Sequence, residues 1–95
     1  MKFKLNYDGK NFNPPTPEEI RDYMKEHNLT GSKLAAITGV SSRQVRRWTS
    51  QKGEKSHQNI PMSAWVLALL YFNGIEITEY RELIQKYFIS LISDS

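Results

Sequence analysis

The chain of 95 residues contains no cysteine, which excludes both a disulfide framework and a thiolate metal site. Its two histidines, His27 and His57, lie far apart in the sequence and have no adjoining ligand pattern, so a metal site of another kind is not expected. The first residues lack the apolar run of a signal peptide, and no stretch approaches the roughly 20 apolar residues of a membrane span. We therefore expect a cytoplasmic protein with no metal ion, no cofactor and no membrane partner.

Signatures of catalysis are also missing. The sequence shows no Ser/His/Asp order, no Gly-rich phosphate loop and no metal-ligand spacing, and the pair Lys52-Gly53 lacks the remainder of a P-loop. Isolated acids such as Glu18 and Glu79 are better explained as favourable charges at the beginning of helices. We therefore do not expect an enzyme.

The charge of the chain is modest in total but uneven along the sequence. The formal net charge is +3 and the pI is about 9.3. Residues 43–55 contain a single acid, Glu54, and five cations: Arg43, Arg46, Arg47, Lys52 and Lys55. Four acids lie in the last quarter of the chain: Glu76, Glu79, Glu82 and Asp94. One face of the molecule is therefore expected to attract a polyanion.

Residues 29–52 are predicted to form two short helices separated by a tight turn. Gly39 can adopt the positive φ that ends a helix, and Ser41 or Ser42 can cap the next one. Small Ala35 allows the two helices to approach closely, and the spacing turns four apolar side chains inward: Leu34, Val40, Val45 and Trp48. The outward residues of the second helix are Ser42, Arg43, Gln44, Arg46, Arg47, Thr49 and Ser50. Three guanidinium groups without an acid suit guanine edges and phosphates.

The N-terminal residues 1–15 alternate in polarity, with Phe3, Leu5 and Tyr7 on one face before the turn pair Asp8-Gly9. This pattern predicts a short β-strand or hairpin packed on the helices. A flexible basic arm that reaches phosphates through Lys2, Lys4 and Lys10 is the alternative.

A first helix is predicted from Thr16 to about His27. Thr16 is the expected N-cap, with Pro17 in the first turn and Glu19 closing a capping box. Its inward stripe is Ile20, Tyr23, Met24 and His27. Thr30 is the expected cap of the second helix, and the third is expected to end near residues 51–53. The polar run 53–59 is predicted to be an exposed loop beside the third helix, where Lys52 and Lys55 could touch the DNA backbone. A loop that is only solvated is the equally favoured alternative.

Residues 61–95 are predicted to form two further helices. Pro61 begins one that runs from Met62 to about Phe72 and is apolar almost all round, which predicts burial. Thr78 is expected to cap the last helix. We expect a homodimer through Trp65, Leu69, Tyr80, Leu83, Tyr87, Phe88 and Leu91. The alternative is that the last helix only seals the core of the monomer.

Residues 29 to 48 carry Leu-Thr, Leu-Ala, Gly-Val-Ser and Val-x-x-Trp in a spacing that resembles the Xre and lambda Cro and repressor type of helix-turn-helix regulator. The short length and the Ile-Pro-Met-Ser-Ala-Trp helix are similar to small phage regulators, including anti-CRISPR-associated autorepressors. The resemblance implies a mainly α, five-helix lambda-repressor-like domain. It also implies base contacts from Ser42, Arg43 and Arg46 or Arg47, and phosphate contacts near Thr30, Ser32 and Gln44.

The sequence thus predicts a single domain, residues 1–95, that binds double-stranded DNA. Within it, 29–52 is the reading unit and 61–95 supplies the core and the dimer interface. The predicted DNA-contacting residues are Ser42, Arg43, Gln44, Arg46, Arg47, Thr30, Ser32, Ser50, Lys52 and Lys55. The predicted function is that of a sequence-specific transcriptional regulator, in the form of a dimeric (auto)repressor of a pseudo-palindromic operator. A protein-interaction module or an antitoxin-type partner protein is the alternative.

Overall fold

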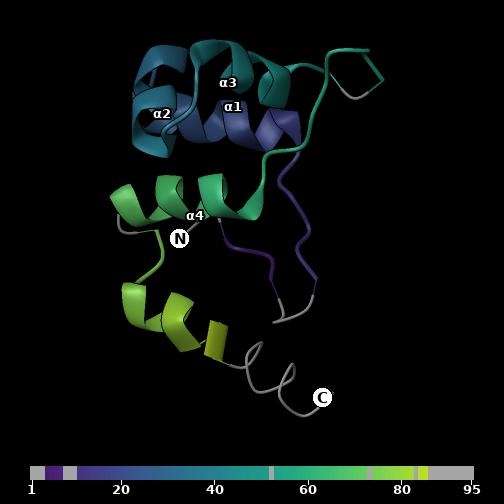
Figure 1. Cartoon of the computed structure of the whole chain (residues 1–95). Helices are drawn as coiled ribbons and strands as arrows, with labels where there is room; N and C mark the ends of the chain where they lie inside the picture. The colour runs from purple at the N-terminus through teal and green to yellow at the C-terminus, as the bar shows by residue number, and fades with distance from the viewer. Residues whose placement is uncertain (1–3, 8–10, 52, 73, 83, 86–95) are drawn as a thin grey trace.

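The computed structural model describes residues 4–7, 11–51, 53–72, 74–82 and 84–85. This part of the chain is mainly helical, with α1 at Pro17–Glu26, α2 at Gly31–Thr38, α3 at Ser42–Thr49 and α4 at Met62–Tyr71. Residues 77–82 and 84–85 are also helical. In Figure 1, α1, α2 and α3 form the upper end of the molecule, α4 lies beneath them, and the segment 77–82 lies at the lower end. The expectation of a mainly α fold is confirmed.

The first three helices begin at side-chain caps that the sequence predicts. The Thr16 hydroxyl accepts from the Glu19 backbone N–H at 3.1 Å, and the Glu19 carboxylate accepts from the Thr16 N–H at 3.1 Å. Thr30 caps α2 by accepting from the Lys33 N–H at 3.2 Å, and Ser41 caps α3 in the same way through Gln44 at 3.2 Å. Each cap stabilises its helix by about 1 kcal/mol.

Two residues with positive φ make the connections between these helices tight. Asn28 (φ 53°) follows α1, and the Leu29 N–H donates to the Met24 carbonyl at 2.7 Å. Gly39 (φ 75°) follows α2, and its N–H donates to the Ala35 carbonyl at 2.8 Å. Asn and Gly are the residues that tolerate this left-handed conformation at helix ends. The turn at Gly39 therefore lies where the sequence predicts it.

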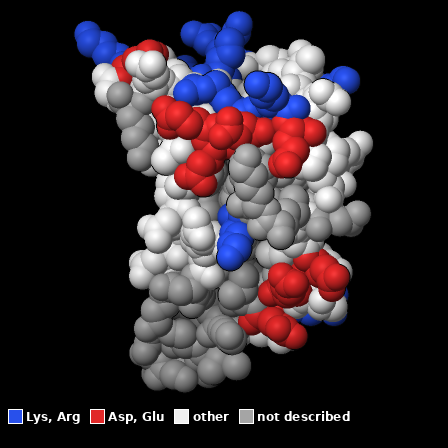
Figure 2. All heavy atoms as spheres, turned by 180° about the vertical axis from the view of Figure 1, so that it is seen from behind, with Lys and Arg blue, Asp and Glu red and all other residues white. Residues whose placement is uncertain are grey.

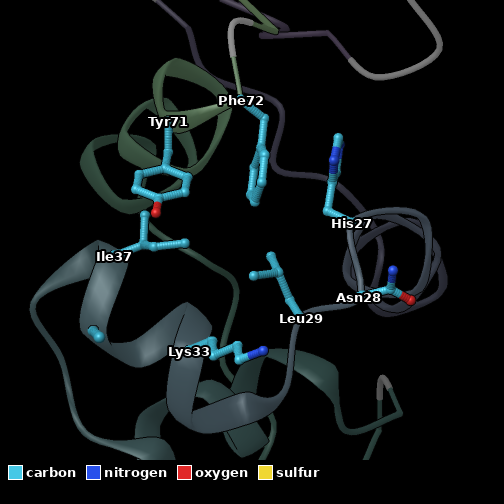
Figure 3. Close-up of a pocket in the computed structure, with 8 residues that line it drawn as sticks. His27, Asn28, Leu29, Lys33, Ile37, Tyr71 and Phe72 are labelled. Carbon is cyan, nitrogen blue, oxygen red and sulfur yellow. The ribbon is translucent and has the colours of Figure 1, made fainter.

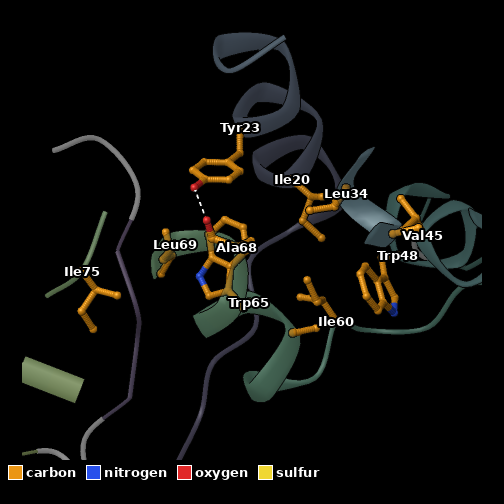
Figure 4. Close-up of a cluster of buried hydrophobic side chains, with 12 residues drawn as sticks. Ile20, Tyr23, Leu34, Val45, Trp48, Ile60, Trp65, Ala68, Leu69 and Ile75 are labelled. Carbon is orange, nitrogen blue, oxygen red and sulfur yellow. Dashed lines mark hydrogen bonds between the residues drawn. The ribbon is translucent and has the colours of Figure 1, made fainter. Parts of the chain in front are cut away.

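A single core joins the four helices (Figure 4). α2 packs against both α3 and α4, and α1 packs against α3. The buried apolar side chains of this cluster are Ile20, Tyr23, Leu34, Ala35, Val45, Trp48, Ile60, Ala64, Trp65, Ala68, Leu69 and Ile75. Trp48 and Trp65 are only 1% and 2% exposed. Truncating either to Ala would destabilise the fold by about 3–5 kcal/mol.

Tyr23 connects α1 to α4 through a buried polar contact. Its hydroxyl donates to the Ala68 carbonyl at 2.6 Å, and its ring meets the Trp65 ring edge-on with 5.1 Å between centroids. Burial of the phenol, with a smaller effect of the Glu26 carboxylate, raises the pKa of Tyr23 to about 12. The hydroxyl therefore stays protonated and donates at neutral pH.

The described N-terminal residues lie against the helices. Leu5 and Phe12 pack on the core, and the Trp65 indole N–H donates to the Lys4 carbonyl at 3.1 Å. The predicted strand or hairpin is not confirmed, because residues 4–7 and 11–15 form only an isolated antiparallel bridge between Tyr7 and Phe12. Phe3 and the predicted turn at 8–9 lie outside the described residues.

Two predicted helix boundaries are wrong. α3 ends at Thr49, before the predicted end near residues 51–53. The last helical segment begins at Ile77, and the Tyr80 N–H donates to the Glu76 carbonyl at 3.1 Å. Glu76 therefore occupies the cap position that the sequence analysis assigned to Thr78, which lies inside the first turn.

The predicted dimer-interface list also needs correction. Trp65 is 2% exposed and Leu69 is 0% exposed within one chain, so both side chains belong to the monomer core. Tyr80 packs partly on the same core. Leu83, Tyr87, Phe88 and Leu91 lie outside the residues whose side chains are described. The prediction that α4 is buried all round is wrong on one face, because Leu67 is 45% and Tyr71 is 65% exposed.

None of the helices in the described ranges is long and apolar enough to cross a membrane.

Candidate nucleic-acid interface

α3 has one basic, exposed face, and its opposite, apolar face is buried in the core. Val45 and Trp48 are each 1% exposed, whereas Arg43 and Arg46 are exposed and Arg47 is half-buried. The three arginines follow the i, i+3, i+4 spacing of one helix face. Together with Ser56 they line a concavity of about 310 Å³, and no Asp or Glu is among the residues that line it. This concavity suits an anionic group.

The charges of the described residues are unevenly distributed over the surface (Figure 2). Figure 2 shows Lys and Arg side chains gathered at the end formed by α1, α2 and α3, with a band of Asp and Glu below them. The exposed carboxylates of α1, including Asp22 and Glu26, belong to the same helical layer as α3 but not to its concavity. A polyanion would therefore be attracted to one end of the molecule.

Both ends of α3 are attached to other helices. At its beginning the Ser42 hydroxyl lies 3.4 Å from the Ser32 hydroxyl of α2, which brings two predicted DNA-contacting residues together. At its end the Arg21 guanidinium of α1 donates to the Thr49 carbonyl. A cation at this end also complements the negative end of the helix dipole. The orientation of α3 is thus fixed by α1 and α2.

The loop that follows α3 folds back onto it. The Gln58 N–H donates to the Arg47 carbonyl at 3.1 Å, and the Ser50 hydroxyl donates to the same carbonyl at 2.9 Å. The His57 ring nitrogen Nδ1 lies 2.9 Å from the Ser50 carbonyl oxygen. The loop predicted for residues 53–59 is confirmed as irregular, but its last residues are attached to the helix.

The side chain of Gln58 also reaches α3. The Gln44 amide Nε2 donates to Gln58 Oε1 at 2.8 Å, which links the first turn of α3 to the far end of the loop. Gln58 is exposed and Gln44 is half-buried. The two amides therefore form a pair at the surface, beside the basic concavity.

Nine of the ten predicted contact residues lie in the described part of the chain, and all nine are exposed or half-buried. Ser32, Arg43 and Arg46 are exposed, as are Thr30 and Lys55, while Ser42, Gln44, Arg47 and Ser50 are half-buried. Lys52 lies outside the described residues. Three residues beside α3 were not predicted: Arg21, Ser56 and Gln58. The sequence offers no signal for them, because their place depends on tertiary packing.

A second concavity, of about 570 Å³, shares no residue with the basic one (Figure 3). It lies between the end of α1, one side of α2 and the end of α4. Its lining residues are His27, Asn28, Leu29, Lys33, Ala36, Ile37, Tyr71 and Phe72. The His27 ring stacks on Phe72 with 4.1 Å between centroids. His27 is the residue that caps the end of α1, so its predicted place near a helix end is confirmed.

The described residues contain no group of three or more His, Asp or Glu side chains that could hold a metal ion. Comparisons of the chain with protein-family models, with curated proteins and with solved structures give no match. The functional interpretation therefore depends on the geometry of α3 and its surroundings.

Proposed function

We propose that the protein is a sequence-specific regulator of transcription that binds double-stranded DNA. In this proposal α2 and α3 form a lambda-repressor-like helix-turn-helix, and α3 lies in the major groove. The observation that carries the proposal is the acid-free face of α3, with Arg43, Arg46 and Arg47 around one concavity and Val45 and Trp48 buried behind it. A short helix held in this way by a second helix is the arrangement with which such motifs read base edges.

The chemistry of the surface divides into two kinds of contact. Arginine side chains can donate two parallel hydrogen bonds to guanine O6 and N7, and each good pair contributes about 1–3 kcal/mol to discrimination between bases. Ser32 lies against Ser42 of α3, and Ser50 directly follows this helix. In the proposal their hydroxyls, the Thr30 hydroxyl and the Lys55 ammonium contact phosphates. Phosphate contacts supply affinity that falls steeply as salt rises.

We further propose that the protein acts as a homodimer. One reading helix covers only a few base pairs, and two of them about 34 Å apart would read a pseudo-palindromic operator. After Trp65 and Leu69 are assigned to the core, the large apolar residues that remain most exposed in the described part are Leu67, Tyr71 and Ile77. They lie on α4 and on the segment after it, away from the basic surface of α3 (Figure 1). Occupancy of an operator by such a dimer would repress transcription, including that of its own gene.

The same exposed apolar residues favour the second candidate, a module that binds another protein. An antitoxin-type protein would cover Leu67, Tyr71 and Ile77 with a different chain. The basic, acid-free α3 favours the DNA-binding function, because a protein partner for α4 would not require it.

The decisive experiment is selection of bound sequences from a random pool of double-stranded DNA by the purified chain. A two-fold symmetric consensus is expected, together with a molar mass of two chains in solution. If no sequence is enriched and the chain is monomeric or aggregates, the DNA-binding proposal is wrong and the interaction module is favoured.

A further inference from the structure

The paired amides of Gln44 and Gln58 have a chemical consequence for base recognition. A glutamine amide carries one acceptor oxygen and two donor hydrogens. Gln44 uses one hydrogen of Nε2 in its 2.8 Å bond to Gln58 Oε1. This bond fixes the rotation of the amide, and it leaves Gln44 Oε1 and the second hydrogen of Nε2 uncommitted in that pair.

An acceptor and a donor side by side on one amide match a particular base. Adenine presents the N6 donor and the N7 acceptor in the major groove, and a glutamine amide can pair with both. Gln44 lies in the first turn of α3, and in a helix-turn-helix the beginning of the recognition helix contacts base edges. Gln44, for which the family resemblance implies a phosphate contact, thus has the donor and acceptor that an adenine edge requires and lies in the turn of α3 from which bases are read.

We propose that Gln58 is a positioning residue that orients Gln44 for recognition of adenine. This inference rests on the proposed DNA-binding function. Its physical basis is preorganisation, because a side chain already held in its binding rotamer loses less conformational entropy when it meets the base. The backbone of Gln58 is itself held by the bond from its N–H to the Arg47 carbonyl at 3.1 Å, so its side chain starts from a fixed position.

The test compares Gln58→Met, which has a similar length but no acceptor, with the wild type. Binding is measured to the operator found by selection and to its single-base variants at one salt concentration. Gln58→Met is expected to reduce the preference for adenine at one position of each half-site by roughly three- to tenfold, the effect of one hydrogen bond. Preferences at the other positions are expected to stay as in the wild type.

Three further variants separate positioning from a structural role. Gln44→Ala is expected to abolish the same adenine preference, and the double variant is expected to show no additional loss. Gln58→Glu keeps an acceptor for Gln44, so it should retain the preference while binding all sequences more weakly. Gln51→Met is the matched control, because Gln51 is an exposed glutamine shortly after α3, and its backbone carbonyl, which the substitution keeps, accepts from the Glu54 N–H at 3.2 Å.

The inference is overturned if Gln58→Met keeps every base preference of the wild type, or if it weakens all positions equally. It is also overturned if Gln44→Ala leaves the base preferences unchanged. In each of these cases the wild type still selects an operator, so the proposed function stands. If the wild type selects no sequence at all, the proposed function fails and the inference fails with it.

Discussion

The substitution Arg46→Gln tests whether the basic surface of α3 meets phosphates. Arg46 is exposed on α3 and lines the concavity that it shares with Arg43, Arg47 and Ser56. Glutamine removes the charge but keeps a long side chain with similar helix propensity, so the fold should not change. The substitution is expected to weaken DNA binding and to reduce its dependence on salt.

The size of this effect follows from counterion release. Each phosphate that a protein neutralises on B-DNA adds about 0.9 to the slope of log K against log salt concentration. A fourfold increase in salt therefore weakens binding by about 3.5-fold for each contact. If Arg46 neutralises one phosphate, the ratio of the dissociation constants at about 200 and 50 mM salt should be about 3.5-fold smaller in Arg46→Gln.

The assay is equilibrium binding to labelled operator DNA at several salt concentrations, with Arg81→Gln as the matched control. Arg81 is also an exposed arginine on a helix, but its segment lies at the opposite end of the molecule from α3 (Figure 1). Its loss removes the same charge at the other end of the molecule, and at 0.1 M salt exposed charges more than roughly 10 Å apart are largely screened from one another. Equal slopes for Arg46→Gln and Arg81→Gln would refute a phosphate contact by Arg46.

Four substitutions test how the fold stabilises this surface, and the stability of each variant is measured by urea denaturation. Tyr23→Phe removes the hydrogen bond to Ala68 and should cost about 1–2 kcal/mol at pH 8. Because the pKa of Tyr23 is raised from 10.0 to about 12, the wild type should lose stability as the pH rises through this range, and the variant should not. The difference in unfolding free energy between the two proteins should therefore narrow, and a constant difference would contradict the burial of the phenol. Gly39→Ala should destabilise by about 1–2 kcal/mol because φ is 75°, whereas the helical Gly31→Ala should stabilise by about 0.5–1 kcal/mol; equal effects would argue against the left-handed turn. Arg21→Met removes the donor to the end of α3 and should cost up to about 1 kcal/mol, and an unchanged stability would show that this contact contributes nothing.

The parts of the fold that the sequence predicts well are those set by local interactions. The capping box at Thr16 depends on residues three positions apart, and the turn at Gly39 depends on one residue that tolerates positive φ. The inward set of α3 follows from helical spacing, so Val45 and Trp48 were assigned correctly. Each of these features depends on a few residues that are close together in the sequence.

The errors occur where tertiary packing decides. Trp65 and Leu69 were assigned to a dimer interface because α4 is apolar almost all round, and periodicity cannot show which side meets the core. Thr78 has good capping chemistry, yet the helix is capped two residues earlier, at Glu76, and Thr78 lies in its first turn. Gln58 lies 14 residues from its partner Gln44, and no local pattern relates two glutamines at that separation.

The length of α3 limits how its contribution to DNA binding can be measured. A helix of eight residues is too short to be stable alone in water, where about 12–15 residues are needed. The cap at Ser41 and the burial of Val45 and Trp48 hold it, together with residues outside the helix such as Arg21. A substitution in any of these supports would lower DNA affinity although none of them need touch DNA. Loss of affinity alone therefore does not identify a contact residue, whereas a changed salt slope or a changed base preference does, because loosening of the helix would affect all sequences alike.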